Sequence, residues 1–501
     1  MYPYNFIHYY FNSDIVDTKP ESVFARLEID KRSGLKTGNI PHDVYSDIMG
    51  FEMDFSKTAA ENTDLILSKT ENFSGQDKSH SLGLFFEFIF KTGDYKFVID
   101  SFHLLNDKLD SGDIQFDPRA YYYIASAMLA MDMCVDAIRL IDEAIENYQS
   151  KSYVFISLKG QVFRTMQKFW LAADCFVLAV NIEPNYPEPS WALKFLHSVL
   201  NKSKCQSIYA KIKGNCKKNS PDYLYGMLAD MAYHAGYVEE SKSILRTQVR
   251  NMACKKISKI GGEVLSSQLD EPDFIIIGMQ KCGTTSLHAY LSSRADVISA
   301  TTKEIGFFGY NYQRGVDWYR STFPHVIDAH GERLLTGEAS PGYVYNMKAL
   351  QRIKDHTRDT KLIMMMRDPV LRTISSYYQK KKMQGIDTPL HDYIRNLLTD
   401  GNKSHLLRES IYIDYIKVWM DAFGKSRLLL LNADNLFAEK GELRKVTDFL
   451  SLSDSGMGYL PHANKGSYPA TDQVIIDKLS HFYKPHNEKL YNYMSCDFGW
   501  L

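Results

Sequence analysis

The chain has 501 residues, of which 45% are hydrophobic and 24% are charged, and its formal net charge is −1. This length predicts two or three domains, and the composition excludes a disordered or fibrous protein. The balanced charge argues against a nucleic-acid partner. Seven scattered cysteines without a C-x-x-C pair predict neither a disulfide framework nor a structural zinc site.

The apolar runs of the chain are short. The longest ones, such as FIII before Gly278 and LIMMM before Arg367, have the length of strands, whereas a membrane-spanning helix needs about 20 apolar residues. The N-terminus also lacks the basic start and apolar run of a secretory signal. The sequence therefore predicts no transmembrane segment and a cytoplasmic enzyme.

Apolar residues in the first half recur at helical spacing, and a short pattern repeats among them. Each copy has a small or turn residue, an apolar residue two positions later and a mostly small residue five positions after the first. The copies start at Gly93, Asp132, Gln167 and Gly236, which are 39, 35 and 69 positions apart, and a degenerate copy near Asn201 would fill the last gap.

This spacing resembles the tetratricopeptide repeat, a helix pair with a period of about 34 residues. The resemblance implies an all-α array over residues 81–255, preceded by a helical capping region at 1–80. Such arrays leave a concave surface, so the acceptor or a protein partner is expected to bind there. The alternative is a plain helical domain with an accidental periodicity.

The helical pattern breaks at Gly261 and Gly262, which places a linker at 256–271 and a second domain at 272–501. In this domain, continuous apolar strands alternate with helical segments, a pattern that predicts a parallel sheet covered on both faces. The predicted units are FIII with a helix from Thr284, LIMMM with a helix from Val370, and RLLLLN from Arg427 with a helix near Lys440.

The most informative segment is PDFIIIGMQKCGTTSL at 272–287, where a buried strand leads through Gly278 and Gly283 into a helix. Unpaired N–H groups and the positive end of the dipole at a helix start attract a phosphate or a similar anion. Lys281 adds a flexible cation, and Cys282 lies where a thiol pKa can be lowered. The predicted anion-binding set is Lys281, Cys282, Gly283, Thr284, Thr285 and Ser286.

This loop differs from the nucleotide triphosphatase loop G-x-x-x-x-G-K-[ST], in which lysine directly follows the second glycine. Here Thr284 follows Gly283, and Lys281 precedes that glycine by two positions. The strand LIMMM ends on Arg367 instead of the acidic residue that helps to hold magnesium in an ATPase. An arginine beside the expected ligand crevice predicts a second anion and no metal.

Two separated anions are what 3′-phosphoadenylyl sulfate (PAPS) offers, with its 5′-phosphosulfate and its 3′-phosphate. The segment 272–287 resembles the 5′-phosphosulfate loop of the heparan-type PAPS-dependent sulfotransferases, and RDPVLRTISSYYQ at 367–379 resembles their 3′-phosphate motif. The resemblance implies that Arg367 and Ser375 hold the 3′-phosphate. It also implies the sulfotransferase fold, an α/β fold with a P-loop-like parallel sheet flanked by helices.

Three further stretches extend the resemblance over nearly all of 272–501. EIGFFGYNYQRGVDWYRSTFP at 304–324 is similar to heparan sulfate N-deacetylase/N-sulfotransferases, and YIDYIKVWMDAF at 412–423 matches the family's Y-x6-W-x3-F helix. NKGSYP at 464–469 resembles the K-G-R loop that closes on the cofactor. This loop adds the cofactor-binding residues Lys465, Gly466, Ser467 and Tyr468.

Several positions depart from the family pattern. Ser467 stands where the family often has an arginine, and Gly306 and Ala339 replace polar positions often implicated in acceptor binding. The family's C-terminal hairpin, which is usually disulfide-bonded, has no cysteine here, and this fits a reducing compartment. The glycan specificity of the family therefore does not carry over.

The resemblance also suggests the chemistry. Charge develops on the sulfonate and on the departing oxygen, so Lys281 is expected at the leaving-group oxygen. Glu304 occupies the family's general-base position E-x-x-F-F, although without that motif it would be an ordinary exposed glutamate. Glu338, at the end of a third predicted strand RLLTGE, is the second candidate base, with a structural salt bridge as its alternative.

The sequence thus predicts a PAPS-dependent sulfotransferase that modifies a hydroxyl or amine of a saccharide and releases adenosine 3′,5′-bisphosphate. Lys380, Lys381 and Lys382 could line a groove for an acidic acceptor or form a solvated face. Two other interpretations stay open: a small-molecule, lipid or protein acceptor, and a repeat scaffold with an inactive cofactor-binding domain. An open basic cleft would favour a polymer, and a closed apolar pocket a small hydrophobic acceptor.

Overall fold

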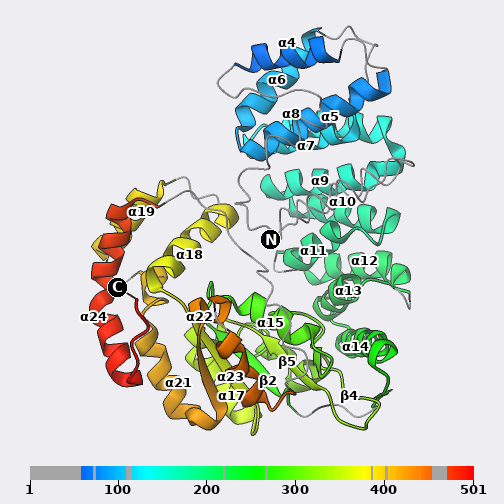
Figure 1. The fold of residues 1–501 in the computed structure, drawn as a ribbon. Coiled ribbons are helices and arrows are strands. Elements are labelled where there is room, and N and C mark those ends of the chain that lie inside the picture. Colours follow the sequence, from blue (N-terminus) through cyan, green and yellow to red (C-terminus); the bar gives the residue numbers. More distant parts are fainter. Residues whose placement is uncertain are drawn as a thin grey trace. The chain divides into compact units, whose positions relative to one another are not determined.

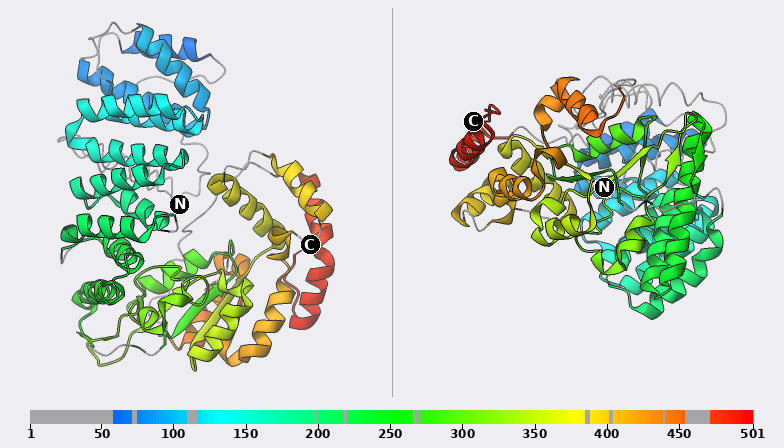
Figure 2. Two further views of the ribbon diagram at one scale, coloured as in Figure 1. Left: turned by 180° about the vertical axis from the view of Figure 1, so that it is seen from behind. Right: turned by 90° about the horizontal axis from the view of Figure 1, so that it is seen from below.

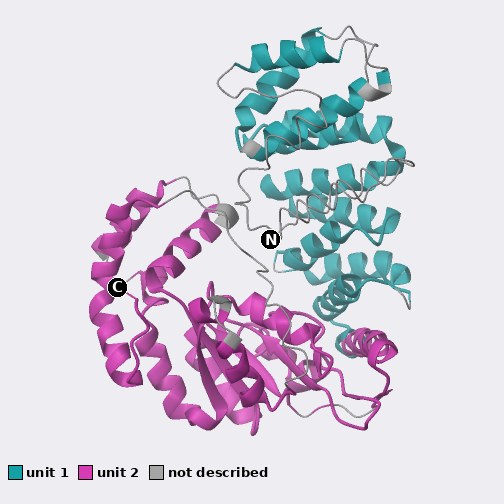
Figure 3. Cartoon of the chain, viewed as in Figure 1, with its two compact units in different colours: residues 1–241 teal, residues 242–501 magenta. Residues whose placement is uncertain are grey.

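The computed structural model contains a series of helices followed by a sheet with its own helices (Figure 1; Figure 2). It divides into two compact units, unit 1 (1–241) and unit 2 (242–501) (Figure 3). The domain limits predicted above, with a linker at 256–271, stay a prediction. The described residues are 58–70, 75–108, 116–197, 199–217, 220–265, 269, 271–384, 388–400, 404–438, 440–453 and 471–500.

Unit 1 is built from helices that follow one another as a stack (Figure 1). They are α4 (Ala59–Lys69), α5 (Gly75–Thr92), α6 (Tyr95–Lys108), α7 (Pro118–Ala130), α8 (Cys134–Asn147), α9 (Ser152–Thr165), α10 (Phe169–Ile182), α11 (Pro187–Leu196), α12 (Lys202–Ile212), α13 (Asp222–His234) and the first turn of α14 (Val238–Ile260). A hydrophobic core extends from Ile66 to Tyr186 and joins the helices from α4 to α10 to one another.

The recurring sequence pattern marks the turn inside each helix pair. Its first residue has a left-handed backbone in all four clear copies, with φ of 86° at Gly93, 59° at Asp132, 58° at Gln167 and 89° at Gly236. A helix begins two residues later in each case, namely α6, α8, α10 and α14. The degenerate copy precedes α12, which Asn201 caps. The periodicity in the sequence is therefore a periodicity of helix pairs.

Unit 2 contains the parallel sheet that the apolar runs predict. Its strands are β2 (Phe274–Gly278), β3 (Val297–Ser299), β5 (Leu335–Ala339), β6 (Lys361–Met366) and β7 (Leu428–Asn432). They lie in the order β3-β5-β2-β6-β7, and every neighbouring pair is parallel. The sequence did not predict β3 or the antiparallel pair of β1 (Glu263–Val264) and β4 (Val326–Ile327), because such short strands form no recognisable apolar run.

Helices flank this sheet, as predicted. α15 (Thr284–Ser293) contacts β2, β3 and β5, whereas α21 (Tyr412–Arg427) contacts β6 and β7. All of β2 is buried, and since successive side chains of a strand point to opposite faces, both faces are covered. The other helices are α16 (Val316–Arg320), α17 (Met347–His356), α18 (Pro369–Gln384), α19 (Leu390–Asp400), α20 (His405–Arg408), α22 (Ala433–Ala438), α23 (Lys440–Leu450) and α24 (Gln473–Met494). None of the described helices has both the length and the hydrophobicity that crossing a membrane requires.

Candidate active site

The predicted site residues that follow a strand directly lie at the carboxyl edge of the sheet. β2 lies between β5 and β6, so the segments that follow these three strands emerge side by side. Lys281 follows β2, Arg367 follows β6, and Ser340 follows β5. The Met279 N–H donates to the Met365 carbonyl at 2.9 Å, which holds the loop after β2 against β6.

The loop after β2 has the predicted strand–turn–helix form. Lys281 and Gly283 have left-handed backbones, with φ of 69° and 81°. The Ser286 N–H donates to the Gly283 carbonyl at 2.9 Å and is the first N–H of α15 to find an acceptor there. The N–H groups of Thr284 and Thr285 therefore have no partner inside the helix, which is the arrangement that binds an anion.

Positive charge accumulates beside this helix start. Lys281 is partly buried, and the pKa of its ammonium is lowered first by burial and then by the charges of Arg367 and Arg372. Within the described part of the chain, no carboxylate forms an ion pair with Lys281. Since these charges repel one another, a bound anion would relieve the repulsion as well as satisfy the helix start.

Arg367 is held at the end of β6 by contacts with two other segments. The Tyr412 hydroxyl donates to its carbonyl at 2.7 Å, and the Asp434 carboxylate lies 3.9 Å from its guanidinium. The guanidinium remains about one-third exposed, at 32%. Ser375 is buried in α18, nearly two turns into that helix. The sequence analysis missed Asp434, because it follows β7 and meets Arg367 only once β7 has paired with β6.

Arg372 is a second residue that the sequence analysis missed. Its side chain is fully buried, and its Nε donates to the Gln280 carbonyl, in the loop after β2, at 3.1 Å. The same guanidinium donates to the Glu409 carboxylate at 2.6 Å and to the Tyr345 hydroxyl at 3.3 Å. Burial opposes its charge, but Tyr345 and Glu409 keep its pKa raised. Arg372 thus ties the anion-binding loop to α18; the motif RDPVLR contains it but does not reveal this contact.

Cys282 points into the protein. Its side chain is fully buried, and its thiol lies 3.8 Å from the Tyr412 hydroxyl. Burial raises the thiol pKa to about 11. The lowered pKa suggested by the helix start is therefore wrong, because desolvation of the thiolate outweighs the nearby arginine charges. Because the side chain is buried, Cys282 can contribute only backbone groups to the surface of the anion-binding loop.

Glu304 lies on a loop attached to the end of β5. Its N–H donates to the Ala339 carbonyl at 3.0 Å. Its carboxylate is exposed and lies 2.5 Å from the Lys303 ammonium. Burial and then the charge of Lys303, the residue before Glu304, lower the pKa of His288, on α15, to about 4. The fold therefore brings Glu304 to the edge that carries the anion-binding loop.

Glu338 is fully buried at the end of β5. It accepts hydrogen bonds from the hydroxyls of Tyr319 and Tyr343, each at 3.0 Å, and from the hydroxyl of Ser340. Burial raises its pKa to about 6, although the three hydroxyl donors act in the opposite direction. Glu338 has no basic partner among the described residues. Its partners are three hydroxyls, and not the salt bridge that was the alternative to a catalytic role.

The same hydroxyls hold the loop that carries Glu304. The Ser340 hydroxyl accepts from the Gly306 N–H at 3.1 Å, and the Tyr343 hydroxyl accepts from the Phe308 N–H at 3.3 Å. Each of these two hydroxyls therefore accepts a hydrogen bond from the loop backbone and donates one to the buried carboxylate. This arrangement connects the buried carboxylate to the position of the exposed one.

Some predicted residues cannot be placed in this way. The loop residues Lys465, Gly466, Ser467 and Tyr468 lie outside the described residues. On α18, Lys381 is exposed and Lys380 is half-buried. A search of the described residues finds no group of histidine, cysteine or acidic side chains that could hold a metal ion.

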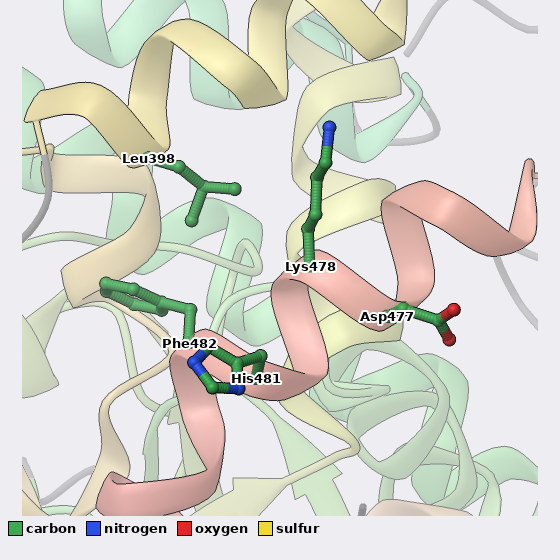
Figure 4. A pocket seen from close by; sticks show the side chains of 5 residues that line it. All are labelled: Leu398, Asp477, Lys478, His481 and Phe482. Atoms are coloured by element: carbon green, nitrogen blue, oxygen red, sulfur yellow. The ribbon is translucent and has the colours of Figure 1, made fainter.

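A surface groove in unit 2 involves different residues. It is lined by Leu398 of α19 and by Asp477, Lys478, His481 and Phe482 of α24 (Figure 4). None of the residues predicted for the site lines this groove. The candidate active site is therefore defined by the three strand ends and their loops.

Comparison with known proteins places these features in a family. A family model described as "Sulfotransferase domain" matches residues 271–484. Human heparan sulfate glucosamine 3-O-sulfotransferase 3A1 is 31% identical over 305 residues, which cover 54% of this chain and 74% of that protein. The human 3-O-sulfotransferase 6 is 30% identical over 256 residues, which cover 46% of this chain and 73% of that protein. A sulfotransferase from Alicyclobacillus acidocaldarius matches 46% of this chain and 97% of its own, with 23% identity and a TM-score of 0.38.

One relative corrects the predicted location. The membrane-associated sulfotransferase kil1 of Dictyostelium discoideum is 23% identical over 313 residues, which cover 46% of this chain and 66% of that protein. The prediction of a cytoplasmic enzyme, drawn from short apolar runs and the lack of a secretory signal, is contradicted by this membrane-associated relative. The finer resemblance to N-deacetylase/N-sulfotransferases stays a prediction. Because a sulfotransferase at 31% identity is covered over 74% of its length, this chain is an enzyme of the sulfotransferase family.

Proposed function

We propose that this sulfotransferase transfers a sulfuryl group from PAPS to a hydroxyl or amine of a saccharide. The observation that carries the proposal is a pair of cationic positions at neighbouring strand ends, Lys281 with the start of α15 and Arg367 after β6. A nucleotide with two separated anionic groups is complementary to this pair. The names of the relatives, heparan sulfate glucosamine 3-O-sulfotransferases, support a saccharide acceptor.

The residues at this edge fit such a donor, since the Lys281 ammonium forms no ion pair with a carboxylate among the described residues. The start of α15 and Lys281 would hold the 5′-phosphosulfate, and Arg367 and Ser375 the 3′-phosphate. When bound, PAPS supplies the sulfuryl group and departs as adenosine 3′,5′-bisphosphate. The residues proposed to complete the donor site are Cys282, Gly283, Thr284, Thr285, Ser286, Lys465, Gly466, Ser467 and Tyr468.

Glu304 is the base in this proposal. Its exposed carboxylate can accept the proton that a hydroxyl or amine loses when it attacks sulfur. The Lys281 ammonium stabilises the negative charge that develops on the departing oxygen. Glu338 is fully buried and cannot reach an acceptor in solvent, so we assign it the positioning of the Glu304 loop.

Two measurements test the donor and the acceptor separately. Calorimetric titration with adenosine 3′,5′-bisphosphate should show binding, and labelled sulfate from PAPS should appear on heparan sulfate. A protein that binds no nucleotide contradicts the proposal as a whole. Nucleotide binding combined with transfer only to a small molecule, a lipid or a protein contradicts the saccharide acceptor alone.

We also propose that residues 81–255 form a tetratricopeptide-like array, a type of domain that binds a partner or substrate on its surface. Its helices α7, α9, α11 and α13 begin 34, 35 and 35 residues apart. On α9, Gly160 lies so close to the Phe176 ring of α10 that a Cβ there would be 2.6 Å from it. Ala172 precedes Phe176 by four residues, as in the A-x3-F signature of this repeat.

Replacement of Gly160 by alanine tests this close helix contact. The added methyl group should lower the midpoint of thermal unfolding, because it displaces the Phe176 ring from a packed interface. Gly226, on α13, is the matched control, since a Cβ there meets no atom within 4 Å. Gly226→Ala should be neutral or stabilising, by up to about 1 kcal/mol. Equal midpoints for the two variants would contradict the proposed helix packing.

A further inference from the structure

The loop that carries Glu304 also presents an aromatic ring to solvent. Tyr310 is 71% exposed, more than any other large hydrophobic side chain in the described part of the chain. Its hydroxyl donates to the Glu304 carbonyl at 3.3 Å. The ring therefore lies next to the residue proposed as the base, on the solvent side of the site.

Gly306 provides the space that this ring occupies. A Cβ at Gly306 would lie 2.4 Å from both Cε1 and Cζ of Tyr310. Gly306 also has a φ of 65°, a left-handed conformation that glycine adopts without strain. The ring therefore fills the space in which a side chain at position 306 would lie.

The backbone around Tyr310 is fixed on both sides. Before it, the Arg352 guanidinium donates to the Phe308 carbonyl at 2.7 Å. After it, the Asn311 side-chain amide donates to the Ile305 carbonyl at 2.8 Å. Together with its own hydroxyl contact, these bonds hold an exposed ring in one place before any ligand arrives.

We propose that the Tyr310 ring is an acceptor-binding platform on which a sugar ring stacks, so that its hydroxyl or amine is directed to Glu304. This inference rests on the saccharide acceptor proposed above. A sugar ring has an apolar C–H face with polar groups at its edge, and a phenol ring is similarly flat and apolar with one polar end. Because the ring is already held in place, little side-chain entropy is lost on binding. The Lys303 ammonium, beside the Glu304 carboxylate, adds a cation for an acidic sugar.

The experiment separates the ring from its hydroxyl and from bulk hydrophobicity. Tyr310→Leu keeps an apolar side chain without a flat ring, whereas Tyr310→Phe keeps the ring without the hydroxyl. With labelled PAPS and heparan sulfate as the acceptor, Y310L should raise the KM for heparan sulfate about tenfold, because the stacking contact is lost. Y310F should raise this KM by less than Y310L does, because it keeps the flat ring and loses only the hydroxyl contact with the Glu304 carbonyl. The KM for PAPS and the Kd for adenosine 3′,5′-bisphosphate should be unchanged in both variants.

Tyr493, in the last turn of α24, is the matched control because it is also exposed, at 39%. Tyr493→Leu should change neither KM. Gly306→Ala is an independent test that leaves Tyr310 itself intact. Its methyl group pushes the ring away, so the KM for heparan sulfate should rise as in Y310L.

An unchanged KM for heparan sulfate in Y310L would overturn the inference, and so would an equal increase in Y493L or Y310F. If Y310L also loses nucleotide affinity, Gly306→Ala decides, and an unchanged KM in that variant refutes the platform. Wild-type protein that binds adenosine 3′,5′-bisphosphate but not heparan sulfate oligosaccharides would refute the platform and leave the donor site intact. Absence of nucleotide binding in the wild type would refute the proposed function itself.

Discussion

The proposed donor side and the proposed acceptor side of the site are each held by a buried charge, and the two charges have opposite signs. On the donor side, the buried guanidinium of Arg372 holds the loop that carries Lys281. On the acceptor side, the buried carboxylate of Glu338 holds, through two hydroxyls, the loop that carries Glu304. In both cases the buried charge fixes a loop, and the outer residue, Lys281 or Glu304, is the one proposed to contact a substrate.

The difference in sign follows from what each substrate brings. A sulfuryl donor brings negative charge, which cations and helix N–H groups stabilise, whereas an acceptor brings a proton, which a carboxylate removes. A buried cation below the donor side adds to the positive potential there, and it contributes to the lowered pKa of Lys281. Substitutions on one side should therefore change the constants for one substrate and spare those for the other.

The largest expected effect lies on the acceptor side. Glu304→Gln should lower kcat about 10³-fold, because a neutral amide cannot take the acceptor's proton. Affinity for adenosine 3′,5′-bisphosphate should be unchanged, since Glu304 does not belong to the donor side. Turnover measured with labelled PAPS, and nucleotide affinity measured by calorimetry, give the two values.

The matched control for this variant is Glu332→Gln, which alters an exposed glutamate in the segment before β5. It should leave kcat and nucleotide affinity at wild-type values. Turnover by Glu304→Gln at the wild-type rate would remove Glu304 from the role of base. Loss of nucleotide affinity in the same variant would show that the two sides are not separate.

The buried carboxylate predicts a dependence of stability on pH. The pKa of Glu338 is raised from 4.5 to about 6 in the folded protein, so the folded state binds more protons than the unfolded state between these values. The stability from this group is therefore fully present below pH 4.5 and is lost as the pH rises through 6. This shift amounts to about 2 kcal/mol.

Glu338→Gln should remove this dependence, because glutamine does not titrate. Chemical denaturation at several pH values, followed by tryptophan fluorescence, gives the free energy of unfolding of each protein. As the pH rises from 4.5 to 7, the wild type should lose about 2 kcal/mol relative to the variant. Parallel curves for the two proteins would mean that Glu338 is not held as a buried, titrating carboxylate.

The smallest of the three effects lies on the donor side. Arg367→Ala should raise the KM for PAPS about tenfold, because a charge-assisted hydrogen bond to the 3′-phosphate is lost. The KM for heparan sulfate should not change. Arg358→Ala, at an exposed arginine before β6, should leave both constants unchanged. An unaltered KM for PAPS in Arg367→Ala would take this residue out of the donor site.

Much of the fold could be predicted because each of its main strands is encoded by a short apolar run in the sequence. The runs FIII, LIMMM and LLLL form strands β2, β6 and β7, and the helices expected after them are present. β3 has only three residues and is defined by its pairing with β5, so no local sequence pattern predicts it. The turns of unit 1 could be predicted because their pattern is also local in the sequence. Each turn residue lies two positions before the helix that follows it.

The position of a candidate site residue at the sheet edge could be predicted where that residue directly follows a strand. Lys281 and Arg367 could be placed in this way, because the ends of parallel strands meet at one edge. Arg372 could not be assigned a contact, since it meets the Gln280 carbonyl across 92 residues. Tyr310 was missed as well, because nothing in the local sequence distinguishes this exposed tyrosine from a buried one.

The central claim is that one nucleotide is held at two neighbouring strand ends, and a crystal structure with adenosine 3′,5′-bisphosphate tests it most directly. The account predicts the 5′-phosphate at the start of α15, within hydrogen-bond distance of the Thr284 and Thr285 N–H groups. It predicts the 3′-phosphate at Arg367 and Ser375. A nucleotide bound elsewhere, or with its 3′-phosphate away from these two residues, would contradict the account.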